Sequence, residues 1–173
     1  MVMATPPQAI PLVPAERYEL NQRRAASAWP ELYDLLDAVK DPEVPVLSLW
    51  ELGVLQRVEV AADGAVTVTI IPTYSGCPAM QQMREDIEAC LRDAGYERVR
   101  IDLQLTPPWT SDYLDSEARQ RLVRYGIAAP DRTDCPQCGS TDVSLISEFS
   151  STACKAMFRC NQCLEPFDQF KRF

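Results

Sequence analysis

Two pairs of cysteines near the carboxyl end are the clearest chemical signal in the sequence. Cys135 and Cys138 form one C-x-x-C pair, and Cys160 and Cys163 form a second. Paired thiolates at such a spacing are the ligand set of a tetrahedral zinc ribbon, provided that the segment between the pairs forms a β-hairpin. A closed four-thiolate site leaves no coordination position for a substrate, so we expect a structural zinc ion that stabilises a small module.

The chain contains no histidine, which limits the chemistry available to it. Ser-His-Asp and Cys-His catalysis are excluded, as is any metal site built on imidazole. The remaining motifs form no complete catalytic constellation, so we do not expect an enzyme that acts by itself. Two alternatives remain for these cysteines: a redox or disulfide pair, or a four-thiolate site that holds iron as in rubredoxin and transfers electrons.

Cys77 is the most interesting single residue outside the two pairs. It precedes Pro78 at the predicted start of a helix, and Thr73 and Gly76 lie just before it. Unpaired backbone N–H groups at a helix N-terminus favour an anion, so we expect a lowered pKa and a partly ionised thiol that can bind metal. The alternative is a small buried residue that caps the helix.

Carboxylates flank the prolines and the glycine of an earlier loop. Asp41, Glu43 and Glu51 become hard ligands for a transient iron ion if the fold brings this loop close to Cys77. Turn formation is the alternative and, on residue type alone, the favoured one, since Asp-Pro commonly starts a turn.

The two remaining cysteines have simpler expected roles. Cys90 falls on the apolar stripe of the predicted second helix, and we expect it in the core. Cys154 lies in the segment between the C-x-x-C pairs, where we expect a buried filler. A substitute ligand or a second reactive thiol are the alternatives for Cys154.

Composition places the chain among globular proteins and limits the classes of partner that it can bind. It has 173 residues, a net charge of −8 and a pI near 4.6, which argue against nucleic acid or an anionic membrane as the main partner. No stretch approaches the roughly 20 apolar residues of a membrane span. The first residues do not resemble a secretion signal. Seven cysteines without an export signal are typical of reduced thiols in the cytoplasm.

The order of predicted elements indicates a small α/β domain followed by a metal module. Residues 1–28 contain four prolines and no periodic apolar face, so we expect a mobile tail. The α/β domain is expected over 29–130 and the zinc-ribbon module over 131–173. Periodicity and turn residues predict an αββαβα order with a three-stranded sheet, the elements being 30–40, 54–60, 65–71, a helix from 78 to Gly95, 99–105 and 116–125.

Several short motifs resemble a known family. Asp41-Pro42-Glu43-Val44-Pro45, Leu52-Gly53-Val54 and Thr73-x-x-x-Cys77-Pro78 resemble the MIP-eighteen family of iron–sulfur assembly domains. The segments CPQCGS, STACKAMFRC and CNQCLEPFDQFKRF resemble the C-terminal module of the PaaD family, whose members are encoded with the subunits of bacterial phenylacetyl-CoA epoxidase. Together the resemblance covers residues 29–173.

The resemblance implies a fold and a function. The fold would be a MIP-eighteen-like α/β sandwich followed by a four-cysteine zinc ribbon. The function would be maturation of an iron site or iron–sulfur cluster in phenylacetate degradation, with the epoxidase reductase and oxygenase subunits as clients and iron–sulfur assembly proteins as further partners. Cys77 matches the family's reactive cysteine, and Asp41, Glu43 and Thr73 match motif positions around a transiently bound iron or cluster. The alternative is a non-catalytic scaffold subunit.

Overall fold

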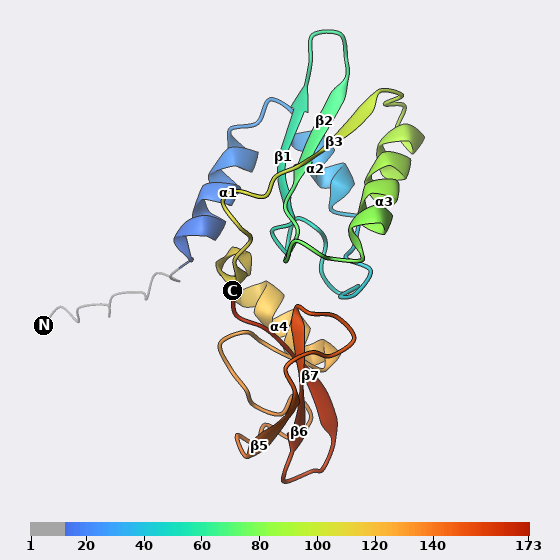
Figure 1. The fold of residues 1–173 in the computed structure, drawn as a ribbon. Helices are drawn as coiled ribbons and strands as arrows, with labels where there is room; N and C mark the ends of the chain where they lie inside the picture. Colours follow the sequence, from blue (N-terminus) through green and yellow to red (C-terminus); the bar gives the residue numbers. More distant parts are fainter. Residues whose placement is uncertain (1–12) are drawn as a thin grey trace, which may run out of the picture.

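The computed structural model describes residues 13–173, which form an α/β domain and a ribbon module (Figure 1). The α/β domain contains a three-stranded sheet in the order β1-β2-β3. β1 (Leu55–Val60) and β2 (Val66–Ile70) are antiparallel, whereas β2 and β3 (Val99–Leu103) are parallel. Helix α3 (Met80–Asp93) makes the crossover between the parallel strands and contacts α2 (Pro30–Leu36). The predicted αββαβα sandwich is thus confirmed.

The sequence pattern explains these elements directly. Val66, Val68 and Ile70 alternate along β2 and are fully buried, as expected for the central strand of a sheet. Met83 and Ile87 lie four residues apart on the buried stripe of α3.

The ribbon module is a four-stranded sheet in the order β4-β7-β6-β5. The hairpin predicted between the cysteine pairs is formed by β5 (Val143–Ser147) and β6 (Lys155–Cys160), and β7 (Pro166–Phe170) follows. Helix α4 (Ser116–Tyr125) ends at Gly126 and leads directly into β4 (Ile127–Ala128), which pairs with β7. The sheet of the ribbon therefore begins before residue 130, where the sequence predicted the boundary.

The predicted mobile tail is wrong for residues 15–25, which form helix α1 (Ala15–Ala25). Leu20 is completely buried, and the Arg17 guanidinium donates a hydrogen bond to the Trp50 carbonyl oxygen (2.8 Å) and lies 5.1 Å from the Trp50 ring centre. The helix has few apolar residues, and its packing relies on an arginine stem against an aromatic ring, which hydrophobic periodicity does not detect. The rest of the predicted tail, residues 1–12, lies outside the described residues.

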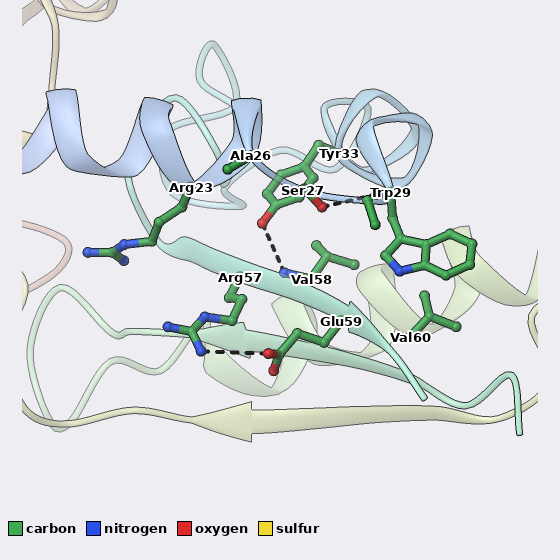
Figure 2. Close-up of a pocket in the computed structure, with 10 residues that line it drawn as sticks. Arg23, Ala26, Ser27, Trp29, Tyr33, Arg57, Val58, Glu59 and Val60 are labelled. Atoms are coloured by element: carbon green, nitrogen blue, oxygen red, sulfur yellow. Dashed lines mark hydrogen bonds and ion pairs between the residues drawn. The ribbon is translucent and has the colours of Figure 1, made fainter. Parts of the chain in front are cut away.

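The edge strand β1 is covered by the connection between α1 and α2 (Figure 2). The Tyr33 hydroxyl accepts a hydrogen bond from the Val58 N–H (3.1 Å), so an edge amide is satisfied by a side chain. Beside it, Arg57 and Glu59 pair at 3.6 Å in an open hollow that Trp29 also lines. No cysteine is among the residues that line this hollow.

Within residues 13–173, no helix has the length and apolar character needed to cross a bilayer.

Replacing Leu20 with alanine tests the packing of α1. Leu20→Ala should lower the free energy of unfolding by about 2–5 kcal/mol, because it removes a fully buried side chain and leaves a cavity. Tyr18→Ala is the matched control on the same helix, since Tyr18 is 58% exposed. Urea denaturation followed by circular dichroism measures both. Equal, small effects of the two substitutions would contradict a packed α1.

Candidate metal centre and cysteine cluster

The four cysteines of the two C-x-x-C pairs converge at one end of the ribbon. Their sulfur atoms all lie within 4.8 Å of one another, with Cys135 and Cys163 3.6 Å apart and Cys138 and Cys160 3.5 Å apart. Four thiolates at about 2.3 Å from a tetrahedral zinc ion are separated by about 3.8 Å. The sulfur arrangement therefore fits a tetrahedral metal ion with four thiolate ligands.

The two turns that carry the cysteines have the same backbone geometry. Gly139 and Leu164 each follow a C-x-x-C pair with positive φ (73° and 69°). Their N–H groups donate to the carbonyl oxygens of Cys135 and Cys160, at 2.8 and 3.0 Å. Leu164 thus adopts a conformation that normally favours glycine, which indicates that the turn is imposed by the site.

Backbone amides favour the thiolate form of one of these sulfurs, that of Cys160, whereas the pKa of Cys163 is raised to about 12. The Cys163 N–H lies 3.4 Å from the Cys160 sulfur, and this hydrogen bond is the main cause that lowers the pKa of Cys160 to about 6, with help from the Gln162 N–H. Thiolates are the ligand form, so N–H donors favour the state that the metal requires.

A second cluster forms around Cys77 at the end of the α/β domain that faces the ribbon. Asp41 is 4% exposed, and its Oδ1 accepts the N–H groups of Glu43 (2.8 Å) and Val44 (2.9 Å). The Asp41 carboxylate and the Thr73 hydroxyl both influence the pKa of the Cys77 thiol, so the two loops meet here.

The expected lowering of the Cys77 pKa is wrong. Helix α3 begins only at Met80, so Cys77 lies in the turn before it, where its N–H donates to the Tyr74 carbonyl oxygen (3.1 Å). Burial raises the pKa of Cys77, outweighing the Ala79 N–H, which lowers it; the Asp41 charge raises it further. The raised pKa favours the protonated form of the Cys77 thiol at neutral pH.

The remaining predicted carboxylates have different surroundings. Glu43 lies at the rim of the Cys77 cluster, with its carboxylate 4.0 Å from the Lys155 ammonium of the ribbon. Glu51 instead pairs with Arg121 at 2.6 Å and accepts the Ser48 N–H at 2.8 Å, which is the turn-stabilising role given as its alternative.

Aromatic contacts hold the ribbon against the α/β domain. The Trp109 indole N–H donates to the Leu52 carbonyl oxygen at 3.0 Å, and its ring lies 5.7 Å from Phe170 and 5.9 Å from Phe173. Thr110 donates a hydrogen bond to the Phe173 carbonyl oxygen at 2.8 Å. The C-terminal strand is thereby fixed beside the loops of the α/β domain.

Sequence reasoning missed the position of Cys154. The structure places this residue in the apolar cluster of the α/β domain, against which Cys77 packs, rather than in the interior of the ribbon. The sequence did contain one indication of a separate role for Cys154. A four-thiolate site needs only the four cysteines of the two C-x-x-C pairs, so a further cysteine between the pairs is not required for that site.

Comparison with known proteins places the two parts of the chain separately. Residues 31–103 match the model of an iron–sulfur cluster assembly protein, and residues 123–171 match that of the PaaD zinc beta ribbon domain. A domain of unknown function, DUF59, from Bacillus anthracis has a similar solved structure, with 25% identity, a TM-score of 0.50 and coverage of 54% of this chain and 89% of that one. The protein is thus an assembly-type α/β domain joined to a zinc-ribbon domain.

Relatives extend the match over most of the chain. A protein of Escherichia coli (strain K12), provisionally named as a subunit of 1,2-phenylacetyl-CoA epoxidase, is 42% identical, covering 87% of this chain and 98% of its own length. An Fe-S protein maturation auxiliary factor of Porphyromonas gingivalis (strain ATCC BAA-308 / W83) is 38% identical, covering 53% of this chain and 88% of its own. This chain belongs to the PaaD family, as the motifs predicted.

Metal analysis tests the ribbon site. The purified protein should contain one tightly bound ion per chain, and Cys138→Ser should lose most of it, because a tetrahedral thiolate site needs all four sulfurs. Cys90→Ser is the matched control, since Cys90 lies on α3 outside this set. Mass spectrometry for metals reads both variants. Full metal content in Cys138→Ser would contradict the assignment.

Proposed function

We propose that this protein is an accessory subunit of a phenylacetyl-CoA epoxidase and helps to assemble or deliver iron or an iron–sulfur cluster to that enzyme. Its relatives carry the names of an epoxidase subunit and of Fe-S maturation factors. The observation that carries the proposal is the meeting of Cys77 with the buried Asp41 and Thr73 at one end of the α/β domain.

In this proposal the residues of the cluster have distinct roles. Cys77 supplies a thiolate to the iron cargo, Asp41 and Glu43 supply carboxylate oxygens, and Thr73 orients the thiol by hydrogen bonding. A set of donors gathered from several loops suits transient binding, because small movements of a loop weaken it. The ribbon cysteines hold a structural zinc ion that is not transferred.

The clients would be the epoxidase components that contain iron: the reductase with its [2Fe-2S] cluster or the di-iron oxygenase subunit. Iron–sulfur assembly proteins would supply the cargo. No disulfide joins any of the seven cysteines, and we propose that the protein works in the reducing cytoplasm, where unoxidised cysteines persist.

Substitution of Cys77 tests this function. Epoxidase subunits produced together with the Cys77→Ser variant should contain at least about tenfold less iron and should lose activity in proportion. Loss of a direct iron ligand should weaken metal binding at least as much as loss of an outer-sphere hydrogen-bond partner does. The variant should keep the zinc content and the thermal stability of the native protein. Cys90→Ser, a half-buried cysteine whose sulfur lies 3.6 Å from the Leu35 carbonyl oxygen, is the control.

The same experiment separates the two candidate roles. Full client iron and activity with Cys77→Ser would refute delivery through this thiol, and would leave a scaffold subunit that acts by contact alone.

Asp41→Asn tests the carboxylate without removing its hydrogen bonds. The asparagine oxygen can still accept the Glu43 and Val44 N–H groups, so the loop should keep its structure, while the negative charge is lost. We expect unchanged or slightly higher stability, because burial disfavours the ionised carboxylate, together with reduced client iron. Chemical denaturation and iron analysis of the client measure the two effects. A stable variant with full client iron would exclude a role for this charge.

A further inference from the structure

Cys154 belongs to the ribbon in sequence but contacts the α/β domain in space. It directly precedes β6, is 5% exposed, and lies in the large apolar cluster against which Cys77 packs. The separate apolar cluster of the ribbon is built from Ala128, Cys135, Cys160 and Phe167. In Figure 1 one end of the ribbon sheet lies toward the loops of the α/β domain.

Hydrogen bonds fix the turn that carries Cys154. Its carbonyl oxygen accepts the Lys171 N–H at 2.8 Å, and its sulfur lies 3.0 Å from the Thr152 hydroxyl. The Ala153 backbone hydrogen-bonds to the hydroxyl of Tyr74, whose carbonyl oxygen in turn accepts the Cys77 N–H at 3.1 Å. The turn at 152–155 and the turn at 74–77 are therefore directly connected.

The Cys77 and Cys154 thiols also share charged neighbours. Burial is the main cause that raises the pKa of both Cys77 and Cys154, and the Asp41 carboxylate raises each as well, so this carboxylate is close to both. Lys155, which is 5% exposed, lies 4.0 Å from Glu43 and 3.3 Å from Asp168. The ribbon thus contributes a buried cation beside the thiols and the carboxylates.

We propose that Cys154 is the second thiolate ligand of the cargo that Cys77 holds, so that the ribbon completes the iron site. The identity of the cargo as iron or an iron–sulfur cluster rests on the proposed function; the two-thiol site itself rests on the contacts above. Two thiolates suit iron better than one, and the Asp41 carboxylate lies close enough to affect the pKa of both thiols. Each thiol releases its proton to solvent as the ion binds, and Lys155 offsets part of the added negative charge.

Strand β6 links Cys154 to the metal site of the ribbon. Cys160, a ligand of the ribbon metal site, ends β6, and Cys154 precedes the first residue of the same strand. A metal ion held by the four ribbon cysteines would therefore help to keep Cys154 in position without touching the cargo.

Cobalt(II) binding to the zinc-loaded, full-length protein tests the proposal, because sulfur-to-cobalt charge-transfer absorption increases with the number of thiolate ligands. The native protein should bind one cobalt ion in addition to zinc, with absorption typical of two thiolates. Cys154→Ser and Cys77→Ser should each lose about half of this absorption and should bind cobalt about tenfold more weakly or worse. Cys90→Ser should match the native protein, and zinc content should stay constant throughout. Cys154→Ala provides a second variant if serine perturbs the buried turn.

The outcomes distinguish the new ligand from the proposed function. Unchanged cobalt affinity and absorption in both Cys154 variants, with loss in Cys77→Ser, would overturn the role of Cys154 and leave the function of Cys77 intact. A native protein that takes up no second ion would overturn the two-thiol site. If the native protein shows a two-thiolate spectrum and both single variants lose it, the two-thiol site is supported. This holds even if the iron content of the epoxidase proves independent of Cys77.

Discussion

A buried positive charge fixes how the two modules of this protein meet. The Lys155 side chain is almost completely buried at the start of β6, and its ammonium lies 3.3 Å from Asp168 of the ribbon and 4.0 Å from Glu43 of the α/β domain. An unpaired buried ammonium costs several kcal/mol, so the ribbon strand occupies this position only where carboxylates surround it. The loop that contains Asp41 and Glu43 is therefore held against the turn that contains Cys154.

The ribbon is too small to depend on apolar packing alone. Its interior cluster consists of four residues, two of which are cysteines of the metal site. Such a module gains its folding free energy mainly from metal binding. Trp109 adds a second support, because its ring packs on Phe170 and Phe173 while its N–H is bonded to the α/β domain. A metal ion on the four cysteines would add to these aromatic contacts in keeping β6 and β7 in fixed positions.

The family relationships show what the ribbon adds. The maturation factor of Porphyromonas gingivalis aligns over 93 residues, which are 88% of its own length, so it has no room for the ribbon of this chain. In this chain, the added module places the Cys154 thiol and the Lys155 ammonium beside the loops of the α/β domain.

Local features were determined by the sequence itself. The hairpin around Gly64, the end of α4 at Gly126 and the convergence of the C-x-x-C pairs follow from turn chemistry, periodicity and ligand spacing, which act over a few residues. The motifs around Asp41 and Cys77 indicated the position of the candidate site, although not its surroundings.

Only the tertiary structure decided the packing of α1, the raised pKa of Cys77 and the meeting of Cys77 with Cys154. Each depends on groups that are distant in the chain: Trp50 beneath α1, the burial of the Cys77 turn, and the ribbon docked through Lys155. Solvation and electrostatics depend on distance in space, and a sequence read along its length does not contain those distances.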